Sequence, residues 1–109
     1  MKLLIAFVQK EDTAKLLRRV REANVSVTSV DSAGGFLRKR NTTIFAALPD
    51  EKLQEVIAMI KDVCQARTER VDTIFATGDL ESVGLPTPTE IPVGGATVLV
   101  LEITDVVKI

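Results

Sequence analysis

The spacing of hydrophobic residues along the chain changes repeatedly, and each change predicts a new element. Residues 3–8 form a short apolar run between polar flanks, which is typical of a buried strand. From Glu11 to Asn24 apolar residues recur every three or four positions, which predicts an amphipathic helix. Asp12 is the expected N-cap, and Asn24 is expected to end the helix in the left-handed conformation. Residues 25–32 are rich in β-branched side chains and predict the next strand, with a phase change near its end.

The second half of the chain repeats this alternation. Residues 42–48 alternate in a way that predicts a strand with apolar residues on both faces. Asp50 is the expected cap of a second helix, whose apolar stripe runs to Cys64. Because Cys64 lies on that stripe, we expect a buried structural thiol rather than a reactive one. Residues 96–103 predict a last strand, and an apolar tail follows it.

The segment 67–93 interrupts the pattern. It contains three prolines and two glycines before Gly94, together with scattered charges, and predicts a long loop with a short strand at 71–75. A loop of this length in a small domain is usually functional or disordered.

The order strand, helix, strand, strand, helix, long loop, strand is the ferredoxin-like βαββαβ pattern of the α+β class. We expect a single domain over residues 1–109, with helices on one face of the sheet. The other face carries Phe, Ala, Leu and Val, so we expect it to pack against another subunit in an oligomer.

Composition narrows the function by exclusion. Lys and Arg number 14 and Asp and Glu 15, so the net charge is −1, which does not favour nucleic-acid binding. The one cysteine cannot form an internal disulfide, which favours a reducing cytoplasm. The apolar runs are too short for membrane insertion, and the N-terminal run is too short for a signal peptide.

The residues also argue against catalysis and metal binding. The chain has no His, one Cys and no acidic cluster with ligand spacing, so we expect no metal site. Ser and Thr have no evident base to activate them. The loop carboxylates Asp79, Glu81 and Glu90 are more simply solvated than arranged as an acid–base pair. We therefore expect a binding protein rather than an enzyme, and no cofactor.

The segment from Gly34 to Thr43 is the candidate binding stretch. Two glycines lead into Phe36 and Leu37, and the cations Arg38, Lys39 and Arg40 follow. Glycine lets backbone N–H groups approach a ligand, and the cations can hold phosphate. One interpretation is a loop for an anionic, partly flat molecule such as a nucleotide. The alternative is a hairpin connection whose charges are merely solvated.

Several motifs in this order resemble the PII-like family of cyclic di-AMP receptors. They are Gly34-Gly35-Phe36-Leu37-Arg38, Asn41-Thr42-Thr43, Cys64 with Arg67, and Val93-Gly94-Gly95-Ala96-Thr97-Val98. The resemblance covers almost the whole chain. It implies a cytoplasmic homotrimer that binds a nucleotide between subunits and signals to an unidentified protein target by rearranging its loops.

The resemblance also implies a set of ligand-binding residues. They are Thr28, Gly35, Phe36, Leu37, Asn41 and Ala47, with Ser26, Arg38, Arg40, Leu99 and Lys108 as further candidates. An Asn amide can pair with an adenine edge, and the Thr28 hydroxyl can reach a phosphate. The ligand so implied is cyclic di-AMP or another adenine nucleotide.

The chain departs from the family at several of these positions. Family members commonly carry Arg at Ser26, small residues at Lys39 and Arg40, Gly at Ala47, an aromatic at Leu99 and Gln near Lys108. A different hypothesis is a protein-interaction module that docks on a partner through segment 67–93 without a small ligand.

Overall fold

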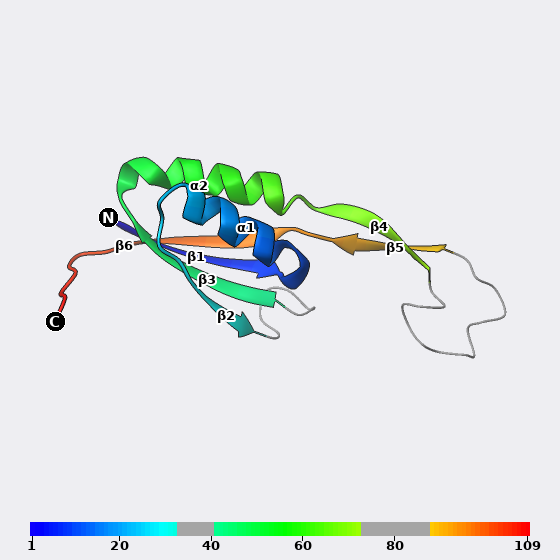
Figure 1. Ribbon diagram of the computed structural model, residues 1–109, viewed down its shortest axis with the longest axis horizontal. Helices are drawn as coiled ribbons and strands as arrows, with labels where there is room; N and C mark the ends of the chain where they lie inside the picture. The colour runs from blue at the N-terminus through cyan, green and yellow to red at the C-terminus, as the bar shows by residue number, and fades with distance from the viewer. Residues whose placement is uncertain (33–40, 73–87) are drawn as a thin grey trace.

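The chain forms a four-stranded antiparallel sheet with two helices on one face, and a two-stranded arm that projects from one end (Figure 1). The structure is a computed structural model that describes residues 1–32, 41–72 and 88–109. The elements are β1 (Lys2–Gln9), α1 (Lys10–Glu22), β2 (Thr28–Ser32), β3 (Asn41–Leu48), α2 (Asp50–Val63), β4 (Arg67–Asp72), β5 (Pro88–Val93) and β6 (Ala96–Glu102).

The strand order of the main sheet is β2-β3-β1-β6, with β1 antiparallel to both of its neighbours. Leu4 lies opposite Ala46 of β3 and opposite Val100 of β6, which fixes the register on both sides. The first and last strands of the chain are therefore neighbours in the sheet. This arrangement confirms the predicted ferredoxin-like βαββαβ fold.

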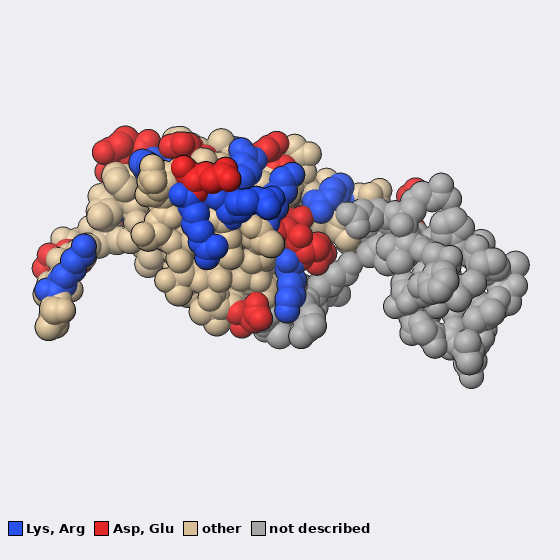
Figure 2. All heavy atoms as spheres, viewed as in Figure 1, with Lys and Arg blue, Asp and Glu red and all other residues tan. Residues whose placement is uncertain are grey.

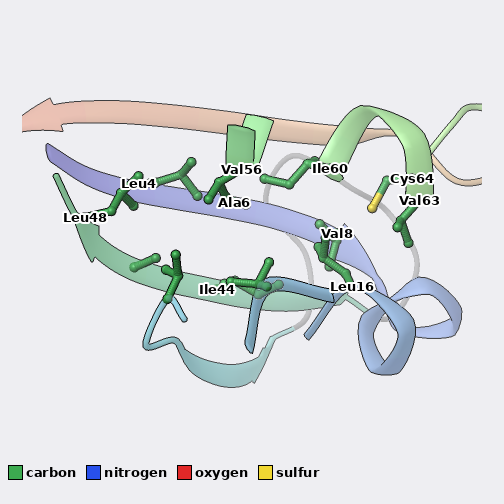
Figure 3. Packing of buried hydrophobic residues seen from close by; sticks show 13 residues of the cluster. Leu4, Ala6, Val8, Leu16, Ile44, Leu48, Val56, Ile60, Val63 and Cys64 are labelled. Atoms are coloured by element: carbon green, nitrogen blue, oxygen red, sulfur yellow. The ribbon is translucent and has the colours of Figure 1, made fainter. Parts of the chain in front are cut away.

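The core fills the space between the sheet and the helices. Leu4, Ala6 and Val8 are fully buried and point toward the helices, as the alternation of a strand requires (Figure 3). From the other side, Leu16 of α1 and Val56 of α2 meet them. Most of this core is aliphatic, as the scarcity of aromatic residues indicates.

The helix ends differ in part from the sequence prediction. Asp12 does not cap α1: the N-cap is Gln9, and Asp12 lies in the first turn, where its carboxylate accepts a hydrogen bond from Arg67. Asp50 does not cap α2 either, because the cap is Pro49. The Asp50 carboxylate binds the N-terminal ammonium group at 2.8 Å instead. Both carboxylates bind cationic groups that are distant in the sequence. Rules for helix caps consider only neighbouring residues and therefore do not predict these contacts.

The prediction for Asn24 is confirmed. Its φ of 62° places it in the left-handed region just after α1. Val25 and Val27 then pack on the core before β2 begins, whereas Val30 lies on the opposite face and is 51% exposed. The phase change in this segment is thus the point where the chain passes from the core edge into the strand.

The prediction of a long loop over 67–93 is wrong for its two ends. β4 and β5 pair antiparallel, from Arg67 opposite Val93 to Asp72 opposite Pro88, and form the arm of Figure 1. The sequence did not predict β5 because it contains two prolines, which normally argue against a strand. Pro88 begins the strand, and Pro92 is four residues further on, so both ring nitrogens face the same edge. In a two-stranded ribbon one edge needs no ladder donors, and proline is accommodated there.

Candidate functional site

The face of the sheet opposite the helices is apolar and open. Ile5 of β1 lies between Phe45 of β3 and Leu99 of β6 on this face, which we call the open face. Phe45 is 37% exposed and Leu99 is 39% exposed, and Leu101 on the same face is 46% exposed. In the described part of the chain both helices lie on the other side. An apolar surface of this kind usually marks an interaction site.

The open face also carries most of the described candidate ligand residues. Thr28 lies opposite Phe45, Asn41 and Ala47 share the parity of Phe45 on β3, and Leu99 lies on the same side of β6. Asn41 is only 2% exposed, whereas Thr28, Ala47 and Leu99 are exposed. The structure therefore places these four candidate residues on one face of the sheet.

The same residues are not close to one another within one chain. Asn41 and Ala47 are six positions apart on β3, which corresponds to about 20 Å along a strand. Thr28 pairs with Phe45, so it belongs to the end of the sheet that holds Ala47. A single chain thus presents two half-sites, one at Asn41 and one around Thr28 and Ala47.

Two further candidates lie outside the strands, Ser26 two residues before Thr28 and Lys108 after the end of β6. Ser26 is exposed and lines a shallow polar cavity of about 460 Å³ with Arg21, Asn24, Val25 and Val27. Lys108 is exposed in the C-terminal segment, which leads away from the end of β6 (Figure 1). The remaining candidates, Gly35, Phe36, Leu37, Arg38 and Arg40, lie outside the described residues, as do Asp79 and Glu81.

Charges on the helical side are mixed rather than segregated. Figure 2 shows Lys and Arg side chains lying among Asp and Glu side chains over the two helices. Arg19 pairs with Asp62 between the helices, and Lys10 lies 3.8 Å from Asp31. The helical face seen in Figure 2 therefore has no continuous patch of cations that would attract a polyanion.

Cys64 is buried beside an apolar cavity of about 360 Å³ between α2 and β6. It is 3% exposed, and the cavity is also lined by Ile57, Ile60, Ala96 and Val98. Burial, reinforced by the nearby Asp12 carboxylate, raises the pKa of the Cys64 thiol to about 11. The thiol is therefore protonated at neutral pH, and the prediction of a buried structural cysteine is confirmed.

The base of the arm holds a cluster of polar contacts that the sequence did not indicate. The Gly94 N–H donates to Gln9 Oε1 at 2.7 Å, and the Gly95 N–H donates to the Cys64 carbonyl at 2.6 Å. Arg67 donates from Nη2 to Asp12 Oδ1 and from Nη1 to the Gln65 carbonyl, both at 2.9 Å. We call these residues, Gln9, Asp12, Cys64, Gln65, Arg67, Gly94 and Gly95, the arm junction.

Only part of the arm junction carries a sequence signal. Cys64, Arg67 and the Gly94-Gly95 pair belong to the sequence motifs, but the sequence does not indicate the contact between Gln9 and a residue 85 positions away. Such a contact follows from the register of β1 against β6, which places the end of the first strand beside the start of the last.

Among the described residues there is no group of three or more His, Cys, Asp or Glu side chains arranged to hold a metal ion. In the same described part, no helix is long and apolar enough to cross a membrane.

Comparison with known proteins gives two findings. A family model described as "Cyclic-di-AMP receptor" matches residues 1–109. A solved structure described as the crystal structure of a functionally unknown protein from Pediococcus pentosaceus ATCC 25745 is similar, with a TM-score of 0.77 and 33% sequence identity. That similarity covers 99% of this chain and 96% of the other chain. The resemblance noted in the sequence motifs therefore extends over the full length.

Proposed function

The chain belongs to the cyclic-di-AMP receptor family, and we propose that it is a PII-like signalling protein that binds cyclic di-AMP between the subunits of a homotrimer. Another adenine nucleotide is the alternative ligand. Receptors of this kind sense a ligand rather than transform it, which agrees with the absence of any His from the sequence. The family membership supports a signalling role, and the arrangement of the open face supports the subunit interface as its place.

The observation that carries the interface proposal is the separation of the two half-sites. Asn41 and Ala47 lie on the same face but about 20 Å apart along one strand, too far for one small ligand to reach both. A second chain packed on the exposed apolar face would bring its Thr28 and Ala47 toward the Asn41 end of the first. The half-sites would then complete each other across the contact.

Each proposed residue has a chemical role at such an interface. The Asn41 amide offers one donor and one acceptor, which matches the edge of adenine. Backbone N–H donors and an apolar wall would come from Gly35, Phe36 and Leu37. The Thr28 hydroxyl would donate a hydrogen bond to phosphate. Because Ser26 carries no charge, the phosphate-binding charge would come from Arg38 or Arg40, each contact contributing about 1.5–3 kcal/mol.

The signal would leave the site through the loops. Ligand binding at an interface can order segments beside it, and the arm lies next to the Asn41 end of the sheet in Figure 1. We propose that the arm presents the ligand state to a protein target, and that this happens in the cytoplasm, where the unpaired Cys64 stays reduced.

Isothermal titration against cyclic di-AMP, ATP, ADP and AMP tests the ligand proposal. We expect saturable binding of cyclic di-AMP, with Asn41→Ala weakening it at least about tenfold, since one lost pairing contact is worth about 1–3 kcal/mol. Gln54→Ala removes an exposed amide from α2 and is the matched control, expected to bind normally. If Asn41→Ala binds as tightly as the parent, Asn41 is not part of the site. If none of the four nucleotides binds at high micromolar concentration, the nucleotide proposal is refuted.

A second candidate function is protein docking through the arm without a small ligand. The arm projects from the sheet, and among the side chains that the structure describes, the buried core cluster includes none from β4 or β5. An arm of this kind is free to serve as a contact surface. A nucleotide-independent partner that requires the arm would favour this candidate.

A further inference from the structure

Gln9 occupies a position between the proposed nucleotide site and the base of the arm. It is the last residue of β1, and its Cα partner in the ladder with β3 is Asn41. Both residues lie on the open face, and both are nearly buried, with Gln9 at 7% and Asn41 at 2% exposure. Directly opposed residues in a sheet have their Cβ atoms about 4.5–5.5 Å apart, so their side chains are neighbours.

On its other side Gln9 holds the arm. Its Oε1 atom accepts the Gly94 N–H at 2.7 Å, at the point where the chain returns from β5 to the sheet. The hydrogen bond is partly buried, and an N–H that loses its acceptor there is disfavoured, so the position of the Gln9 carboxamide constrains Gly94.

Gly94 is not free to move alone. A Cβ atom at this position would lie 2.1 Å from the Gln65 carbonyl oxygen and 2.7 Å from Arg67 Nη1, so the backbone here is packed directly on the start of the arm. Arg67 is in turn held by Asp12, a residue buried to 5% exposure. A displacement of Gly94 therefore reaches both strands of the arm together.

We propose that Gln9 is a positioning residue that couples the nucleotide site to the arm: when ligand engages Asn41, the adjacent Gln9 carboxamide shifts and carries Gly94 and the arm base with it. The inference rests on the proposed function and adds the route by which that site reaches the arm. Coupling is reciprocal, so an arm held in its ligand-bound position strengthens nucleotide binding by the same factor.

The test compares binding with the response of the arm in the full-length protein. Cyclic di-AMP affinity is measured by isothermal titration, and amide hydrogen exchange of residues 67–72 and 88–93 is followed with and without it. In the parent we expect ligand to change arm exchange by about tenfold or more. Gln9→Met keeps the length of the side chain but removes the acceptor, and we expect it to bind within about fivefold of the parent while the arm response disappears.

Two further variants separate coupling from simple loosening. Gln9→Glu keeps an acceptor oxygen in either protonation state and should restore the arm response. Asp12→Asn weakens the hold on Arg67 but leaves Gln9 and Gly94 in place, so arm exchange should be faster in both states while the ligand-induced change persists.

The outcomes distinguish the two proposals. A full arm response in Gln9→Met, or loss of the response in Asp12→Asn alone, would overturn the coupling role of Gln9. Binding by the parent with no change in the arm would overturn the coupling and leave the proposed function standing. No binding by the parent would overturn the proposed function and this coupling with it.

Discussion

At the residue scale, the two adjacent glycines of the arm junction have different requirements. Gly94 and Gly95 both have positive φ, 82° and 83°, a region that other residues enter only with strain. A Cβ at Gly94 would collide with the Gln65 carbonyl oxygen, whereas a Cβ at Gly95 would meet nothing within 4 Å. The backbone conformation demands glycine at both positions, and the packing demands it at Gly94 alone.

This difference predicts unequal costs for two substitutions. Gly95→Ala should lower the free energy of unfolding by about 1 kcal/mol through backbone strain alone. Gly94→Ala should lower it by about 3 kcal/mol or more, because the arm junction must open to admit the methyl group. Urea denaturation followed by circular dichroism measures both. Equal losses would mean that the close approach to Gln65 is relieved at little cost.

Cys64 gives a prediction for pH. Its pKa is raised from 9.0 to about 11 by burial, so between these values the unfolded chain loses the thiol proton while the folded chain keeps it. The contribution of the protonated thiol is complete below pH 9.0 and is lost as pH rises toward 11. Stability should therefore fall more steeply with rising pH in the parent than in Cys64→Ser, by up to about 1.4 kcal/mol per pH unit. Denaturant titrations at pH 8 to 11 provide the comparison, and parallel curves would contradict the assigned cause.

At the scale of elements, the arm is attached to the sheet at its base, where Val93 of β5 is buried. Its two strands pair with each other, and hydrogen bonds in the arm junction join its base to the start of α1 and the end of β1. A two-stranded ribbon without a packed face is marginal by itself. The junction therefore fixes where the arm leaves the sheet, and a shorter arm should be compatible with the same fold.

The register supplies an exact way to shorten the arm. Glu69 lies opposite Ile91, so replacing residues 70–90 by Asn-Gly joins paired residues through a two-residue hairpin turn. We expect unchanged circular dichroism and a free energy of unfolding within about 1 kcal/mol of the parent. The lower entropic cost of closing a shorter connection offsets the ladder hydrogen bonds that are lost. An unfolded product would show that the arm is needed for folding. The same variant in a pull-down, with and without nucleotide, separates arm docking from nucleotide sensing.

At the scale of the whole molecule, the open face is the dominant feature. Its apolar residues are exposed on one chain, although the sheet places them in a continuous row across three strands, with Phe45, Ile5 and Leu99 adjacent. Burying such a surface is favourable by about 25 cal/mol per Å² of apolar area. A homotrimer that packs through this face would remove it from water and complete the proposed half-sites.

Light scattering coupled to size exclusion tests this assembly. The parent should elute with three times the chain mass of 11.9 kDa, about 36 kDa. Leu101→Lys places an ammonium group on the open face and should shift the mass toward a single chain, since a buried unpaired charge is strongly unfavourable. Ala58→Lys adds the same group to the exposed side of α2 and should remain trimeric. A monomeric parent would refute the trimer and, with it, a site between subunits.

The sequence by itself determined the elements and their order, because strand and helix periodicities are local. The alternation of residues 42–48 and the stripe ending at Cys64 located β3 and α2 within one or two residues. The strand begins one residue earlier than predicted, at Asn41, and this puts Asn41 on the same face as Ala47. The arm was missed because Pro88 and Pro92 are read locally as breakers, while their tolerance depends on a free strand edge.

Only the tertiary structure decided which distant residues meet. The pairing of β1 with both β3 and β6 places Gln9 beside Asn41 and within hydrogen-bond distance of Gly94. Asp12, the expected N-cap of α1, instead accepts a hydrogen bond from Arg67. The structure also places Asn41 about 20 Å along β3 from Ala47, too far apart for one small ligand to reach both. Strand register and side-chain packing depend on the burial of the whole core, so a short stretch of sequence does not determine them.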